Sequence, residues 1–301
     1  MNCNRHCTKA WHRLMETIGG KLLSSFLDRI PTAKYVKNGD VRRGFGHQVG
    51  SFLELATKVA ELQFRNREHV LLFRGQTKDF RNLKGNTTLK PTLFRPVVKG
   101  SPKLPSEQAT TERFEELRRA EQLLVRLYAE KRLLGIRQLE RQRILRWSIL
   151  QHYGVCPTPL LDVTQSLRIA SSIASFEARN LAFVFVLGVP NLSGAITASA
   201  EAGLQIVRLS SACPPSAIRP HLQEGYLLGE YPDMADYGQK EHYSHYEIDF
   251  GRRLIAKFCF DPKSFWKDDT FPKVEKEALY PNKRQDALQK LTLEIKQSIS
   301  R

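Results

Sequence analysis

The sequence lacks any long hydrophobic run, which argues against a membrane-spanning helix. The longest uncharged stretch, residues 180–200, is interrupted by two glycines and a proline. Only residues 181–187 are densely apolar, and that is the length of a strand. The first 28 residues also lack the apolar centre of a secretory signal. We therefore expect a soluble, cytoplasmic protein with no membrane partner.

Cysteine is scarce, and its arrangement argues against a disulfide framework. The five cysteines are odd in number and widely spaced, which fits a reducing compartment. Cys3, His6, Cys7 and His12 could be written as metal ligands, but the cluster is short and has no matching second half. We expect no metal. The chain also has no P-loop, no glycine-rich dinucleotide fingerprint and no nucleophile elbow.

Acidic residues are in short supply relative to basic ones. The 301 residues include 47 Lys and Arg against 31 Asp and Glu, a net charge of +16. Such a field attracts nucleic acid or an acidic partner. It makes a nucleic-acid target conceivable, alongside an unidentified protein target, but it says nothing about the fold.

Hydrophobic periodicity predicts an uneven order of helices and strands. Helical spacing of apolar residues occurs over residues 51–66, 114–134, 136–151, 167–178 and 284–298. Continuous apolar runs predict strands over residues 70–73, 181–187, 204–209 and 254–260, the third of them partly exposed. Ser51 followed by Glu54 is a capping-box signature for the first helix, and Gly135 marks a break between two others.

Helices that cluster early and strands that cluster late predict an α+β fold, with a mainly antiparallel sheet and flanking helices. Residues 1–46 are basic and rich in turn residues. We interpret them as a partly helical N-terminal extension, followed by one domain over residues 47–301.

Arg74 is the first candidate site residue, in the segment Phe73-Arg74-Gly75-Gln76. It follows the apolar run that ends at Phe73, so it should stand at the end of a strand. A guanidinium offers a rigid fork of donors that can grip a phosphate or a carboxylate. Gly75 would let a ligand approach the backbone, and Gln76 adds one donor and one acceptor. The alternative is a structural ion pair at Arg74.

A second group of polar residues lies between residues 151 and 164. Gln151, His152 and Tyr153 come where a helix should end, and an imidazole and a phenol there could bind a hydroxyl and a flat ring. Thr158 and Asp162 follow. Asp162 could orient His152 or Arg74, or it could simply cap backbone amides.

A third element is Arg219-x3-Gln223-x-Gly225. Gln223 could hold a sugar hydroxyl, but a carboxamide cannot act as a general base. Glu224 and Glu230 are the nearby carboxylates, and strand alternation suggests that Glu224 points away.

In this order, these segments resemble the FRG domain family, named for its Phe/Tyr-Arg-Gly motif. The resemblance runs over about residues 47–293 and includes Leu89 to Arg95, Gln151 to Thr164, Arg219 to Tyr226 and Ala278 to Asn282. The layout of FRG domains is similar to that of the ADP-ribosyltransferases, which implies a split sheet with NAD as substrate. By that resemblance, Arg74 would bind the ribose and phosphates, His152 the ribose and Tyr153 the nicotinamide.

The sequence departs from these patterns at three positions. Pro159 and Val163 replace an arginine and a tryptophan of the FRG motif, and Gln223 stands where the transferases usually have a glutamate. The resemblance therefore implies two alternatives. The chain is an ADP-ribosyltransferase or NAD glycohydrolase with Arg74, His152 and Gln223 at its catalytic centre, or it is a module that binds nucleotide or nucleic acid without turnover, for example in a bacterial or phage defence system.

Overall fold

The computed structural model describes residues 18, 21–28, 30–96, 98, 104–245, 247–267, 270–282 and 284–300. Its main sheet consists of β3 (His47–Gln48), β4 (Val70–Gln76), β5 (Leu161–Thr164), β6 (Ala182–Val189), β7 (Ile196–Ser199), β8 (Leu204–Arg208), β9 (Gly225–Glu230) and β10 (Leu254–Phe260). The spatial order is β3-β10-β6-β4-β5-β9-β8-β7, and every neighbouring pair is antiparallel except β3 with β10. The predicted α+β class is confirmed.

Helices flank this sheet, and a small hairpin lies beside it. The hairpin consists of β1 (Leu22–Ser25) and β2 (Lys34–Lys37). The α-helices are α2 (Asn38–Arg43), α3 (Phe52–Arg65), α4 (Glu107–Glu130), α5 (Ile136–Arg141), α6 (Arg143–His152), α7 (Leu167–Ser175), α8 (Leu209–Ala212), α9 (Ile218–Leu222), α10 (Tyr237–Glu241), α11 (Pro262–Phe265), α12 (Lys276–Leu279) and α13 (Ala287–Ile299). Two short 3-10 helices are η1 (Thr92–Phe94) and η2 (Phe250–Arg253).

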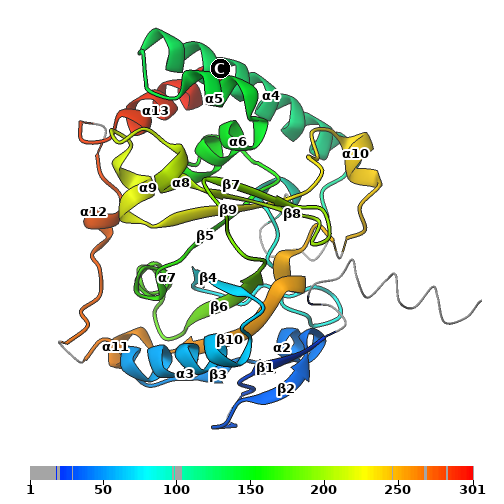
Figure 1. Cartoon of the computed structure of the whole chain (residues 1–301), viewed down its shortest axis with the longest axis vertical. Helices are drawn as coiled ribbons and strands as arrows, with labels where there is room; N and C mark the ends of the chain where they lie inside the picture. Colours follow the sequence, from blue (N-terminus) through cyan, green and yellow to red (C-terminus); the bar gives the residue numbers. More distant parts are fainter. Residues whose placement is uncertain are drawn as a thin grey trace, which may run out of the picture.

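The sheet is divided between its two central strands. β4 pairs with β6 along its whole length, and β5 pairs with β9 along its whole length, but β4 and β5 meet only where Phe73 faces Thr164. The two halves diverge beyond this pair, and Figure 1 shows β10, β6 and β4 apart from β5, β9, β8 and β7. The predicted split of the sheet is therefore present, and it leaves backbone groups of β5 without a strand partner on the β4 side.

Each half of the sheet has its own helical cover. α4, α5, α6 and α13 gather beyond the β7–β9 half, whereas α3 lies at the opposite end of the molecule (Figure 1). α7 packs against β4 and β6, and its Ala170 and Ala174 are completely buried against them. Small side chains let this helix come close to the strands, as its composition predicts.

Several local predictions agree with the structure. The side chain of Ser51 accepts a hydrogen bond of 3.2 Å from the backbone N–H of Glu54 and caps α3. Gly135, with φ of +91°, separates α4 from α5. Asp286 caps α13, which begins close to the predicted start of the closing helix.

Other predictions need correction. β4 continues to Gln76, so Arg74 lies inside a strand and not at its end. The segment around Asp162, where the sequence pattern predicts no strand, is strand β5. β8 is buried except at Arg208, because its alternating residues contact hydrophobic clusters on both faces of the sheet.

The described part of the N-terminal region packs against the domain. The Arg42 guanidinium lies 2.6 Å from the buried Asp249 carboxylate, and the side-chain amide of Asn38 donates to the carbonyls of Gly251 and Leu254. Arg42 and Asn38 precede the expected domain boundary at residue 46. Their contacts attach this part of the chain to η2 and to the start of β10. Cys3, His6, Cys7 and His12 lie outside the described residues.

Within the described ranges, none of the helices combines the length and the apolar character needed to cross a bilayer.

Candidate functional site

A pocket of about 200 Å³ opens where the sheet divides. Its lining comes from the end of η1, from β4, β5 and β9, from α6, α7 and α9, and from the segment after α12, so residues distant in sequence meet there. The lining residues are Phe73, Arg74, Gly75, Arg95, Gln151, Asp162, Val163, Thr164, Ala170, Ile173, Arg219, Gln223, Gly225 and Tyr280. Among them are three arginines and a single carboxylate, which gives the pocket a net positive charge.

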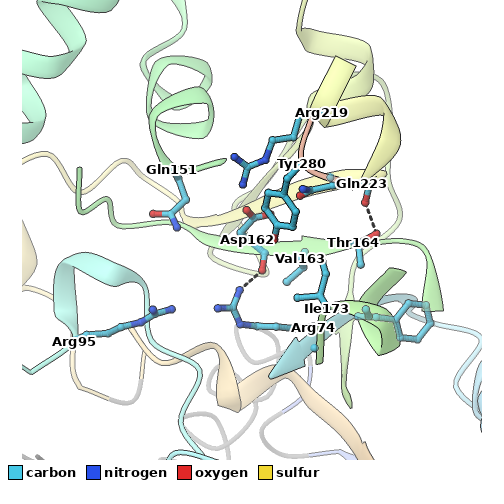
Figure 2. Close-up of a pocket in the computed structure, with 14 residues that line it drawn as sticks. Arg74, Arg95, Gln151, Asp162, Val163, Thr164, Ile173, Arg219, Gln223 and Tyr280 are labelled. Atoms are coloured by element: carbon cyan, nitrogen blue, oxygen red, sulfur yellow. Dashed lines mark hydrogen bonds between the residues drawn. The ribbon is translucent and has the colours of Figure 1, made fainter. Parts of the chain in front are cut away.

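Arg74 crosses the gap between the two halves of the sheet. One terminal N–H donates to the backbone carbonyl of Asp162, which has no strand partner on this side (Figure 2). The Nε atom of Arg74 is buried and has no partner among the described residues. Burial lowers the pKa of this guanidinium, and the nearby Asp162 charge opposes the shift. A desolvated cation with unused donors is well suited to receive an anion.

Arg219 reaches the same pocket from α9 and lies close to two aromatic rings. Its guanidinium carbon lies 4.7 Å from the ring centre of Tyr280 and 5.3 Å from that of Tyr153. Figure 2 shows its side chain entering the space above Asp162. Both contacts are cation–π interactions. The buried Nε of Arg219 has no partner in the described part of the chain, so this donor is left for a ligand.

Arg95 provides a third cation from the end of η1. Its Nε donates to the Lys90 carbonyl at 3.0 Å, which leaves the terminal nitrogens for the pocket. Burial, and to a lesser degree the charge of Arg74, lower the pKa of Arg95 to about 10. It therefore stays cationic at neutral pH. The positive charges of Arg74 and Arg95 repel one another, and an anion between them would relieve this repulsion.

Gln151 lines the pocket from the last turn of α6 and is oriented by two threonines. Its carbonyl oxygen accepts from the hydroxyl of Thr92 at 2.8 Å and from that of Thr158 at 2.6 Å. The side-chain NH2 is left as a donor toward the pocket. Thr158 is fully buried and does not line the pocket, so its part in the site is to position Gln151.

His152 lies behind the pocket wall and not in it. It is buried, and its Nδ1 lies 3.2 Å from Oδ2 of Asp162. Its Nε2 is buried without a partner among the described residues, so an N–H there would have no acceptor. The neutral tautomer with the proton on Nδ1 avoids that cost. Asp162 itself lines the pocket with its side chain 27% exposed.

Tyr153 also lies behind the pocket. Its hydroxyl donates to the buried Asp286, with distances of 3.0 and 2.9 Å to the two carboxylate oxygens. Burial and the Asp286 charge raise the pKa of this hydroxyl, so it remains a donor. The expected direct contact of Tyr153 with a ligand ring is corrected to a supporting one, because its ring packs against Arg219.

Gln223 lines the pocket, but part of its hydrogen-bonding capacity is used in the structure. Its amide nitrogen donates to the Leu279 carbonyl at 2.7 Å, and its backbone carbonyl accepts from the Thr164 hydroxyl at 2.7 Å. Gln76 is not among the lining residues, although its Oε1 is buried without a partner in the described ranges. The structure therefore brings together Arg74, Gln151, Asp162, Arg219 and Gln223 of the predicted site.

Sequence reasoning missed three residues of this region. Arg95 and Tyr280 belong to segments that carry the family resemblance, but neither was predicted to line the site. Asp286 was missed because the predicted closing helix, residues 284–298, includes it as an ordinary helical residue. It caps α13, and it also accepts the backbone N–H of Arg219 at 2.8 Å and so helps to position that residue.

The Tyr280 ring should contribute measurably to anion binding. Replacing it by alanine removes the nearer of the two rings beside Arg219, and a partly buried cation–π contact contributes about 1 kcal/mol. We expect Tyr280→Ala to bind a phosphate-containing ligand about fivefold more weakly by isothermal titration calorimetry. Tyr280→Phe keeps the ring and should match the wild type. Equal losses in both variants would contradict the stacking role.

The fold and the site define an α+β protein with a cationic ligand pocket in the split of its sheet. Residues 69–180 match the family model described as the FRG domain, so the chain contains an FRG domain. The matched region supplies Arg74, Arg95, Gln151 and Asp162, whereas Arg219, Gln223 and Tyr280 follow it. No match was found among the curated proteins, and none among the solved structures.

Proposed function

We propose that this FRG domain binds NAD in the pocket at the split of the sheet and acts on it as an ADP-ribosyltransferase or NAD glycohydrolase. The convergence of Arg74, Arg95 and Arg219 on one pocket carries this proposal. Guanidinium groups form paired hydrogen bonds with phosphate oxygens, and a pyrophosphate offers enough oxygens for all three.

The size of the pocket favours part of a dinucleotide over a complete small ligand. Its volume of about 200 Å³ is below the range of about 300–1,000 Å³ usual for pockets that enclose a whole ligand. It would accommodate one ribose and the adjoining phosphates, with the remaining nucleotide outside. Gln151 and Gln223 supply amide groups suited to ribose hydroxyls.

The proposal is tested by incubating the full chain with NAD labelled in the nicotinamide ring and again with NAD labelled in the adenylate. Released nicotinamide together with labelled protein or nucleic acid is expected for a transferase. Released nicotinamide with free ADP-ribose is expected for a glycohydrolase. NAD that neither binds nor reacts would overturn both readings.

The state of Gln223 favours a second candidate, a nucleotide-binding module without turnover. The side-chain NH2 of Gln223 donates a hydrogen bond to the Leu279 carbonyl, and an ionised glutamate at this position could not make that hydrogen bond. The net charge of +16 extends this alternative to nucleic acid. It predicts ADP-ribose binding without nicotinamide release, or salt-sensitive binding of an oligonucleotide.

A Gln223→Glu substitution examines this position directly. The buried Leu279 carbonyl would lose its donor and face a carboxylate, so we expect stability to fall by about 1–3 kcal/mol. Urea unfolding measures the change. A variant as stable as the wild type, with faster nicotinamide release, would instead show that the pocket accepts a catalytic glutamate here.

A further inference from the structure

The pocket contains three cations, and this raises a question about the charge of the nicotinamide ring. The ring of NAD⁺ is positive, whereas that of NADH is neutral. A cluster of guanidiniums attracts the pyrophosphate but repels a cationic ring. A negative group on the side of the pocket where the ring lies would offset this repulsion and favour the oxidised form.

Asp162 is the carboxylate that the described lining residues offer for this purpose. Glu224 is exposed in a turn with φ of +43°, outside the lining. Glu230 is buried elsewhere and pairs with Arg252 at 2.6 Å. Gln223 occupies the position of the usual glutamate, but it carries no charge.

The Asp162 carboxylate is held in place without an ion pair to any arginine of the described residues. Arg74 donates a hydrogen bond to the backbone carbonyl of Asp162 and not to its carboxylate. The carboxylate oxygen Oδ2 lies 3.2 Å from Nδ1 of the buried His152. A neutral imidazole orients a carboxylate and leaves its negative charge for the pocket. β5 fixes the backbone beneath, since Asp162 pairs with Leu227 of β9.

We propose that Asp162 is the residue that recognises the cationic nicotinamide ribose and stabilises its reaction, in place of a glutamate at the position of Gln223. This rests on the proposed NAD site. The bond between C1′ of the ribose and the nicotinamide nitrogen breaks, and its electron pair goes to that nitrogen, which becomes neutral. The positive charge moves to the ribose, next to Asp162. The oxygen of water or of an acceptor hydroxyl then bonds to C1′, and its proton passes to the Asp162 carboxylate.

Asp162→Asn removes the charge and keeps the shape, because the asparagine oxygen can still accept from Nδ1 of His152. Glu224→Gln is the matched control, since it removes one nearby negative charge outside the pocket. Calorimetry measures the affinities of the full-length proteins for NAD⁺, NADH and ADP-ribose. A nicotinamide-release assay measures turnover.

The wild type and Glu224→Gln should bind NAD⁺ about tenfold more tightly than NADH. In Asp162→Asn this ratio should fall to about one, ADP-ribose affinity should stay within about threefold, and nicotinamide release should drop about 100-fold.

An unchanged ratio in Asp162→Asn, with NAD⁺ still bound, would overturn the role of Asp162 and leave the NAD site intact. Loss of ADP-ribose binding in this variant would assign Asp162 a structural role instead. A wild type that binds none of the three ligands would overturn the proposed function itself.

Discussion

Arg74→Ala is expected to weaken NAD binding about 100-fold or more. The variant removes the cation that bridges the two halves of the sheet at the pocket. Two charge-assisted hydrogen bonds to phosphate contribute about 1.5–3 kcal/mol each, and every 1.4 kcal/mol corresponds to about tenfold in affinity. Arg74→Lys keeps the charge but not the planar fork, so it should recover only part of the loss.

Two controls separate this effect from a general loss of charge or of folding. Arg126→Ala removes a cation whose side chain is 65% exposed on α4, and it should leave NAD affinity unchanged. The stability of Arg74→Ala should fall by about 1–3 kcal/mol, because the Asp162 carbonyl loses its donor, and urea unfolding establishes that the variant is folded where its binding is measured. An Arg74→Ala protein that binds NAD within about threefold of the wild type would remove Arg74 from the site.

Gly75→Ala is expected to destabilise the fold by about 3 kcal/mol or more. A Cβ at this position would lie 1.9 Å from the Ala170 carbonyl oxygen and 2.9 Å from the Ala174 amide nitrogen. Both atoms belong to the backbone of α7, so relief requires the whole helix to move away from β4. Overpacking of a well-packed core costs about 1–3 kcal/mol, and backbone collisions exceed that range.

This collision changes the interpretation of the glycine in the Phe-Arg-Gly segment. From the sequence, Gly75 was expected to let a ligand approach the backbone. In the structure, the missing Cβ allows the backbone of α7 to pack closely against β4. Gly50→Ala is the matched control, because its nearest neighbour would be the flexible Glu54 carboxylate at 3.7 Å. Urea unfolding should give a large loss for Gly75→Ala and a change below about 1 kcal/mol for Gly50→Ala. Similar values for the two variants would contradict the close packing of α7 on β4.

The helices and central strands of this fold could be predicted because their signals are local. Ser51 and Glu54 lie close enough along the chain to reveal the start of α3, and the apolar run of β6 indicates a strand buried on both faces. β5 was missed because only four residues form it, between prolines and a helix cap, and its partner β9 lies more than sixty residues later.

Only part of the site could be predicted from the sequence. The motifs show which segments contribute to the site, but they do not show in which direction each side chain points. Arg74, Gln151, Asp162, Arg219 and Gln223 do meet in one pocket. His152 and Tyr153 follow Gln151 directly, but a helix turns each residue by about 100°. Their side chains therefore point behind the pocket, where they support Asp162 and Arg219. Tyr280 joins the pocket through the fold of the C-terminal segment, which no local pattern indicates.

The most direct test of the central claim is a crystal structure of the full chain with ADP-ribose bound. We predict that the pyrophosphate lies between Arg74, Arg95 and Arg219 in the split of the sheet, within hydrogen-bonding distance of at least two of these guanidiniums. ADP-ribose bound on another surface, with this pocket empty, would contradict the account.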